Sequence, residues 1–145
     1  DAHADQAALE NYIAATSGTL IAVAAAMLGQ KDLTAARQYG WAIGCANYLN
    51  AIPALLDQQR VPLVDGRPQA VAALAQKGLD CLDQARQDRA LIAPTARSAF
   101  LTGWTTKAVL TQAKAHPHRV IDGLYPVNPL RSAVMLLWQA NTHRF

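Results

Sequence analysis

The chain has 145 residues, of which 52% are hydrophobic and 16% are charged, and its formal net charge is +3. This length fits one domain, and the composition excludes a disordered tail, a collagen-like chain and a disulfide-rich miniprotein. The net charge is too small to indicate a nucleic-acid-binding protein by itself.

Helical signals dominate from the N-terminus onward, and strand signals are nearly absent. A first helix is expected from about Gln6 to Leu28, ending at Gly29. A second helix is expected from Leu33 to about Leu56, with Asp32 as its N-cap. Pro53 falls in the last turn of this second helix and predicts a kink or a stop there.

The second half of the chain carries further helices. A proline- and glycine-containing loop should cover residues 57–69, followed by a third helix from about Gln69 to Arg89. A fourth helix should begin at Pro94 and end before His116, and a fifth should run from Pro129 to about Asn141. The sequence therefore predicts an all-α helical bundle of about five helices, in one domain over residues 1–145.

Apolar and small residues recur at helical spacing and indicate how these helices pack. Two apolar stripes are expected, formed by Phe100, Trp104 and Ala108 and by Leu130, Ala133, Val134, Leu137 and Trp138. Two ridges of small residues, which allow close helix approach, are formed by Gly18, Ala22 and Ala26 and by Ala36, Gly40 and Gly44. Residues 11–30 and 38–56 carry no charge, but their amide and hydroxyl groups favour buried helices of a soluble protein over membrane spans.

Charge is distributed unevenly along the chain. Residues 1–56 hold four acidic and two basic side chains, whereas residues 57–145 hold six acidic and eleven basic ones. Between Arg86 and Arg119 there are six basic residues and one acidic residue. Two interpretations stay open for this stretch: a solvated helix face, or a surface that faces phosphates or anionic lipid head groups.

Catalytic motifs are missing from the sequence. There is no nucleophile elbow, Walker loop, zinc-protease helix or dinucleotide-binding glycine pattern. Cys45 and Cys81 are far apart and are expected to be small core side chains. One pair of acidic residues, Asp1 and Asp5, has the spacing that would place two carboxylates on one helix face. Because this pair lies at the start of the chain, no catalytic residue and no metal ligand is assigned.

Three segments in order resemble the C-terminal half of the squalene/phytoene synthase family. They are Tyr12-Ile-Ala-Ala-Thr-Ser-Gly18, then Tyr39-Gly-Trp-Ala-Ile-Gly-Cys-Ala-Asn-Tyr-Leu-Asn50, and then Arg60-Val-Pro-Leu63. The resemblance implies the all-α isoprenoid-synthase type of fold, whose enzymes use aspartate-rich helices and Mg²⁺ to ionise prenyl diphosphates. It also implies that the chain is the C-terminal part of a longer protein.

The sequence departs from the enzymes where their chemistry lies. Their pattern Gly-x-Ala-x-Gln-x-x-Asn-x-x-Arg-Asp, with a further acid four residues on, is matched at Gly40, Ala42 and Asn47. The positions of the two acids are occupied by Ala51 and Leu55. In this respect the chain is closer to a divergent branch of the family, which includes the mitochondrial complex I assembly factor related to phytoene synthase.

The resemblance implies a catalytically inactive domain that binds an isoprenoid or other lipid, or that acts as an assembly factor, without a cofactor. Its cavity-lining candidates are Tyr12, Thr16, Gly44, Asn47, Asn50 and Arg60. A second interpretation of the two asparagines is that they bond helix backbone or a buried water. Two alternatives stay open for the whole chain. One is a head-to-head prenyl diphosphate transferase with Mg²⁺ ligands on upstream helices, and the other is a structural interaction module.

The sequence also supports expectations about partners and location. We expect a homodimer formed through the first or second helix, because their small-residue ridges suit close self-packing. No nucleic-acid partner is expected. The protein is expected to be cytoplasmic, with peripheral contact to the inner membrane as a further expectation.

Overall fold

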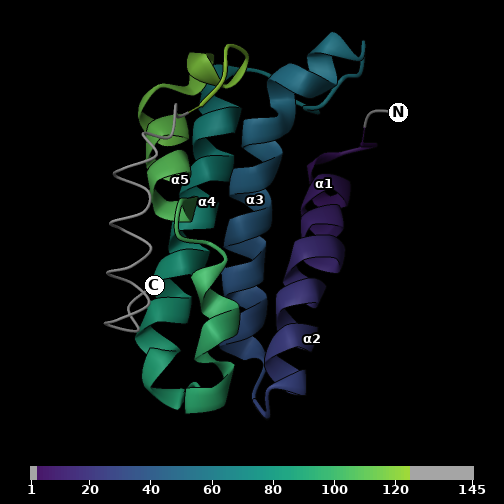
Figure 1. The fold of residues 1–145 in the computed structure, drawn as a ribbon. Coiled ribbons are helices and arrows are strands. Elements are labelled where there is room, and N and C mark those ends of the chain that lie inside the picture. The colour runs from purple at the N-terminus through teal and green to yellow at the C-terminus, as the bar shows by residue number, and fades with distance from the viewer. Residues whose placement is uncertain (1–2, 125–145) are drawn as a thin grey trace.

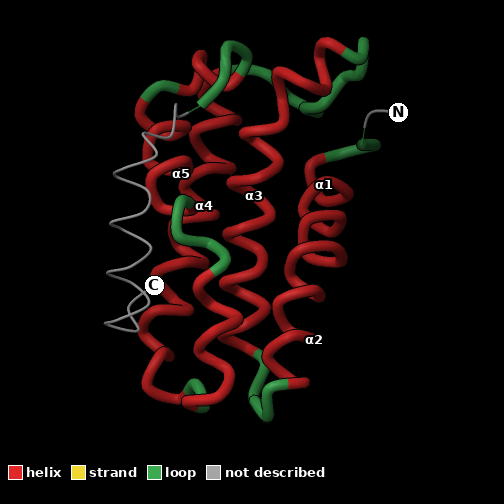
Figure 2. The backbone as a smooth tube through the Cα atoms, in the orientation of Figure 1, coloured by secondary structure: helices red, strands yellow, loops and turns green. Residues whose placement is uncertain are grey.

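The computed structural model describes residues 3–124, which form helices and turns without a strand (Figures 1 and 2). Residues 3–124 contain five α-helices: α1 (Gln6–Ile13), α2 (Thr19–Met27), α3 (Thr34–Asp57), α4 (Pro68–Gln87) and α5 (Thr106–Ala115). Four shorter segments connect or extend them: η1 (Ala14–Gly18), η2 (Asp88–Leu91), η3 (Pro94–Leu101) and η4 (Pro117–Val120). The expected all-α bundle is confirmed. None of the described helices has both the length and the hydropathy of a membrane span.

The expected first helix is present as α1, η1 and α2 in one continuous rod. Asp5 caps its start, since the backbone N–H of Ala8 donates to Asp5 Oδ1 at 2.7 Å. At its end Gly29 has φ +90°, a left-handed conformation that glycine adopts without strain. Gln30 N then donates to Ala25 O, which closes the helix by a Schellman motif.

The expected second helix is α3, which lies at the centre of the bundle between α2 and α4 (Figure 1). The helix begins at Thr34 with Leu33 as its N-cap, so the prediction of Asp32 as N-cap is wrong by one residue. The Asp32 carboxylate lies directly before the cap and accepts a hydrogen bond from Thr34 N at 2.9 Å. Pro53 does not stop the helix, which continues to Asp57. Figure 1 shows the last turns of α3 leaning away from the bundle axis, as a proline inside a helix favours.

The expected third helix is α4, and the expected fourth helix is not one α-helix. It consists of the 3₁₀ segment η3, a turn at residues 102–105 and α5. The buried hydroxyl of Tyr39 donates to the carbonyl of Phe100, which would otherwise accept the next helical hydrogen bond. Gly103 also lies so close to α3 that a Cβ there would come within 2.6 Å of Ile43. Contact with α3 thus explains the interruption.

Because of this interruption, the expected apolar stripe of Phe100, Trp104 and Ala108 does not form one buried face. Phe100 is fully buried, but Trp104 and Ala108 are half-buried. The face that α5 buries consists of Thr106, Val109, Leu110 and Ala113. The expected fifth helix, residues 129–141, and its stripe lie outside the described residues.

The small residues of α3 set the distance between the helices of the bundle. A Cβ at Gly40 would lie 2.6 Å from Ser17 O and 2.9 Å from Gly18 Cα. A Cβ at Gly44 would lie 2.7 Å from the Ser17 Cβ. The expected ridge of Ala36, Gly40 and Gly44 is therefore buried, whereas Ala26 of the other expected ridge is exposed.

Replacement of Gly40 by alanine tests this close contact between α3 and η1, which we call the α3–η1 seam. Alanine is favoured over glycine in a helix by about 1 kcal/mol, but the new methyl group would meet backbone atoms of η1. We expect Gly40→Ala to lower the free energy of unfolding by about 1–3 kcal/mol, measured by urea denaturation with circular dichroism.

Gly66 provides the matched control, because no heavy atom lies within 4 Å of a Cβ placed there. We expect Gly66→Ala to change the free energy of unfolding by no more than about 0.5 kcal/mol. An unchanged stability of Gly40→Ala would show that the seam is looser than the geometry indicates.

The outer face of α2 is apolar and open to solvent. Leu20, Val23 and Met27 are 68%, 50% and 83% exposed, respectively. Their spacing places them on one face of the helix. Two copies that meet along this face would bring no like charges together, since residues 11–30 carry none. The face is thus suited to the homodimer that the sequence predicts.

Light scattering coupled to size exclusion at micromolar concentration tests the dimer. We expect a mass of twice 15.6 kDa, a buried area of at least ~1,200 Å², and dissociation by Val23→Glu. Gln58→Glu, which adds the same charge in the exposed loop after α3, should leave the mass unchanged. A wild-type mass of 15.6 kDa would contradict the prediction.

Candidate functional site

A surface groove of about 530 Å³ lies between the N-terminal helical rod and α3, and we call it the α1–α3 groove. Its walls come from α1, η1, α3 and the loop segment 60–62. Of the six cavity-lining candidates, five line it: Tyr12, Thr16, Gly44, Asn47 and Arg60. Asn50 is exposed and does not line it. Since Tyr12, Thr16 and Asn47 are themselves exposed, the site is an open groove and not an enclosed cavity.

The π-helical turn η1 brings hydroxyl groups to this groove. The backbone N–H of Thr19 donates to Ala14 O, five residues back, instead of four as in an α-helix. Thr16 and Ser17 of this turn line the groove. The Thr16 hydroxyl donates to Tyr12 O at 2.7 Å, which fixes its position at the groove wall.

Three aromatic rings gather at one end of the groove. The ring centroids of His3 and Tyr12 are 5.1 Å apart, those of His3 and Tyr48 5.9 Å, and those of Tyr12 and Tyr48 6.3 Å. All three residues line the groove. Such an aromatic end wall offers apolar ring faces together with polar ring edges.

The loop segment that forms the opposite wall is held in place at two points. Gln59 has φ 57° in the left-handed region, and Arg60 N donates to Leu55 O at 3.0 Å, which together close the end of α3. The Tyr48 hydroxyl donates to the carbonyl of Pro62, and its partial burial raises the pKa of Tyr48. The backbone of Arg60 is therefore held in place, and its side chain extends from a defined position.

The groove carries positive charge and no negative charge. Arg60 is exposed, and its guanidinium forms no ion pair with any residue of the described part. No aspartate or glutamate of residues 3–124 lines the groove. A guanidinium binds phosphate or carboxylate oxygens with two parallel hydrogen bonds. The electrostatics of the groove thus favour an anionic group.

Ala51 and Leu55, which the sequence resemblance aligns with two acids of the enzymes, both line the groove. Mg²⁺ is bound mainly through carboxylate oxygens. The side chains that residues 3–124 bring to this groove are a guanidinium, an imidazole, an amide, hydroxyls and apolar groups, a set without the carboxylates that Mg²⁺ prefers. Over residues 3–124, no three His, Cys, Asp or Glu side chains gather in a way that could hold a metal ion.

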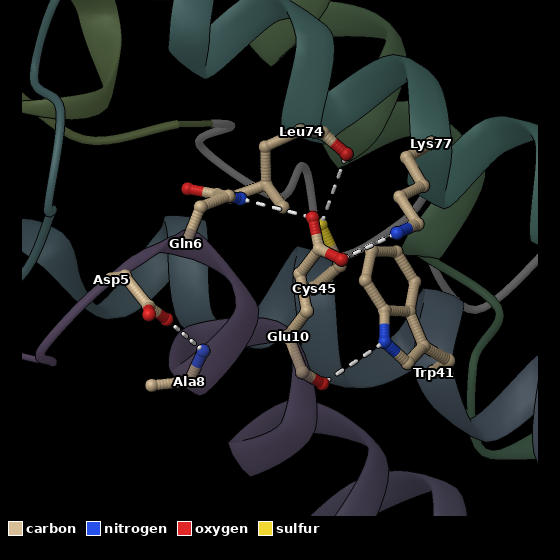
Figure 3. A network of polar contacts seen from close by, with 8 residues as sticks. All are labelled: Asp5, Gln6, Ala8, Glu10, Trp41, Cys45, Leu74 and Lys77. Atoms are coloured by element: carbon tan, nitrogen blue, oxygen red, sulfur yellow. Dashed lines mark hydrogen bonds and ion pairs between the residues drawn. The ribbon is translucent and has the colours of Figure 1, made fainter.

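A polar network fastens α1 to α3 and α4 behind the groove (Figure 3). Glu10 Oε2 lies 2.5 Å from Lys77 Nζ, and this ammonium lies 5.5 Å from the ring centroid of Trp41. Trp41 Nε1 donates to Glu10 O at 3.3 Å. Partial burial acts to raise the pKa of Glu10, but hydrogen bonds from Lys77 and Gln6 outweigh it and lower this pKa. The network fixes α1 and with it one wall of the groove.

The two cysteines are part of the packing, as the sequence predicts. Cys45 is buried and its Sγ lies 3.6 Å from Leu74 O, whereas Cys81 is half-buried. Burial raises the pKa of Cys45 to about 12 and also raises that of Cys81. Neither thiol is therefore activated as a nucleophile.

Sequence reasoning missed His3, Tyr48 and the segment Val61-Pro62 as parts of the groove. A helix that ends near Leu56 and a proline six residues later could have indicated that the chain turns back toward Tyr48. The position of His3 had no comparable signal in the sequence. It depends on the helix cap at Asp5 and on the path of residues 3–4 that lead into this cap.

No protein-family model, no curated protein and no solved structure matches the chain.

The Glu10–Lys77 pair gives a pH-dependent contribution to stability. Because the pKa of Glu10 is lower in the folded state, the pair stabilises the fold above the unfolded value of about 4.3, and this contribution is lost as the pH falls through the folded pKa. We expect Glu10→Gln to be less stable than the wild type by under about 1 kcal/mol at pH 7. The difference should approach zero near pH 3 in urea denaturation.

Lys77→Met serves as the control background, because it removes the charge and keeps an apolar stem over Trp41. In this background the pH-dependent difference produced by Glu10→Gln should shrink, because the ion pair with Lys77 is gone and only the hydrogen bond from Gln6 still lowers the pKa of Glu10. A pH-dependent difference as large as in the wild type would assign the effect to another partner of Glu10.

Proposed function

We propose that the chain is a non-catalytic helical domain that binds an isoprenoid or related lipid with an anionic head group in the α1–α3 groove. One observation carries this proposal: Ala51 and Leu55 both line the groove. The sequence resemblance aligns these two residues with the acids of the squalene/phytoene synthases. By that resemblance, the groove is apolar at the two points where the enzymes bind metal ions.

The other lining residues of the groove support the choice of an amphiphilic, anionic ligand. Arg60 supplies a positive charge that no acid of residues 3–124 pairs, and Thr16, Asn47 and the Tyr12 hydroxyl supply hydrogen-bonding groups. Ile13, Leu55 and Val61 supply apolar surface. An amphiphile with an oxyanion head group matches this combination, and the volume of about 530 Å³ lies in the usual range of small-molecule sites.

The proposal leaves the family resemblance and the biological role as hypotheses. An assembly factor of the divergent branch would use the same groove or its surroundings for a partner. We also propose a cytoplasmic location with peripheral contact to the inner membrane, which would give access to a lipid ligand. A transferase remains the alternative if aspartate-rich helices precede this segment, and a structural module remains the third option.

Binding and turnover of prenyl diphosphates test the proposal. We expect farnesyl and geranylgeranyl diphosphate to bind in isothermal titration calorimetry. With Mg²⁺ present, we expect no head-to-head product above a boiled control. Measurable turnover would overturn the non-catalytic assignment, and absence of binding would overturn the ligand assignment.

Two aspartate substitutions on neighbouring positions of α3 locate the binding. Leu55→Asp places a negative charge in the groove, so we expect it to weaken binding by about tenfold or more through repulsion of the anionic head group. Ala54→Asp places the same charge on an exposed position outside the groove and should have little effect. Equal effects of both variants would contradict the assignment of the groove.

A further inference from the structure

A second groove of about 510 Å³ lies on the other side of the loop segment 60–62, and we call it the α3–η4 groove. Its walls come from the C-terminal end of α3, the loop before α4, and η4 with the residues that follow it. Its apolar lining residues include Ile52, Leu56, Leu63, Val120 and Ile121. The motif Arg60-Val-Pro-Leu63 lies in its wall, but the sequence did not predict a groove there.

The lining of the α3–η4 groove is apolar and partly open to solvent. Leu56, Val61 and Ile121 are 41%, 63% and 56% exposed, respectively. These three large side chains gather at one groove, and such a gathering marks a binding surface more often than scattered exposure does. Arg60 and His118 are the ionisable side chains of its described lining, so the groove has basic groups and no acid.

The two grooves differ in polarity. Hydroxyl, amide and aromatic groups share the α1–α3 groove with apolar side chains such as Ile13 and Leu55, whereas aliphatic side chains and prolines dominate the α3–η4 groove. Arg60, Val61 and Pro62 line both. The guanidinium of Arg60 therefore stands at the border between a mixed, more polar groove and a mostly apolar one.

The border segment is fixed on both sides of its exposed valine. The closure of α3 at Gln59 holds Arg60 before it, and the hydrogen bond from Tyr48 to the Pro62 carbonyl holds the chain after it. The Val61 side chain is left at the surface between these two anchor points. A flexible hydrocarbon chain that crosses from one groove to the other would pass over it.

We propose that the ligand is a single-chain amphiphile that occupies both grooves. Arg60 binds its oxyanion head group in the α1–α3 groove, and its hydrocarbon chain passes over Val61 into the α3–η4 groove. This inference rests on the proposed function, because it assumes that the α1–α3 groove holds the head group. Beyond the proposed function, the inference gives the position of the ligand's hydrocarbon chain and a reason why two adjacent grooves differ in polarity.

A series of alkyl phosphates, titrated below their micelle concentrations in calorimetry, tests the chain site. We expect affinity to rise by about fourfold per added methylene until the α3–η4 groove is filled. Dodecyl phosphate should bind far more tightly than inorganic phosphate, which reports the head-group site alone. Dodecanol should bind more weakly than dodecyl phosphate because it offers no charge to Arg60.

Substitutions in each groove then separate the head-group site from the chain site. Arg60→Gln should weaken both dodecyl phosphate and inorganic phosphate. Leu56→Gln and Ile121→Gln should weaken dodecyl phosphate by about tenfold and leave inorganic phosphate unchanged. Leu91→Gln is the matched control, since this leucine is 69% exposed and lines neither groove.

The possible outcomes distinguish this inference from the proposed function. If dodecyl phosphate binds through Arg60 but Leu56→Gln and Ile121→Gln do not change its affinity, its hydrocarbon chain lies elsewhere and only this inference fails. If no alkyl phosphate binds at any chain length, both fail. Circular dichroism of each variant verifies folding, which exposed positions such as these should preserve.

Discussion

Gly40 and Gly44 on α3 bring the N-terminal rod so close that a single methyl group at either position would collide with Ser17 or Gly18. This close approach sets the position of η1 relative to α3, and η1 carries two of the residues that line the α1–α3 groove. The polar network of Glu10, Trp41 and Lys77 then fixes the same rod near its start. The shape of the groove thus depends first on Gly40 and Gly44, which have no side chains, and then on the polar network of Glu10, Trp41 and Lys77.

The ends of the helices were the most predictable part of the fold, because their signals are local. Gly29 ends α2 with a positive φ, as its residue type indicates, and the start of α3 falls within one residue of its expected position, with Leu33 in place of Asp32 as the N-cap. The break between η3 and α5 had no such signal. It depends on a hydrogen bond from Tyr39, which lies 61 residues away in the sequence, and on the contact of Gly103 with Ile43.

The candidate site was predictable to the extent that it lies on regular helices. Thr16, Gly44 and Asn47 line the groove because helical spacing brings their positions to facing surfaces of the N-terminal rod and α3. Asn50 fell outside it, because Asn47 lies at the edge of the face that Gly44, Tyr48, Ala51 and Leu55 present to the groove, and Asn50 lies beyond that edge. The loop wall and the α3–η4 groove were not foreseen, because they depend on the return of the chain at Gln59 and on its anchoring by Tyr48.

The π-helical turn η1 also suggests how such a groove could arise in evolution. A π turn holds one residue more than the α-helical turn it replaces, and one residue corresponds to a rotation of about 100° around the helix axis. Deletion of a single codon here would restore regular pitch and rotate α1 relative to α2, which would carry Tyr12 away from the groove. The α1–α3 groove and a bundle with regular helical pitch are thus separated by one insertion event, without any change in the residues of α3.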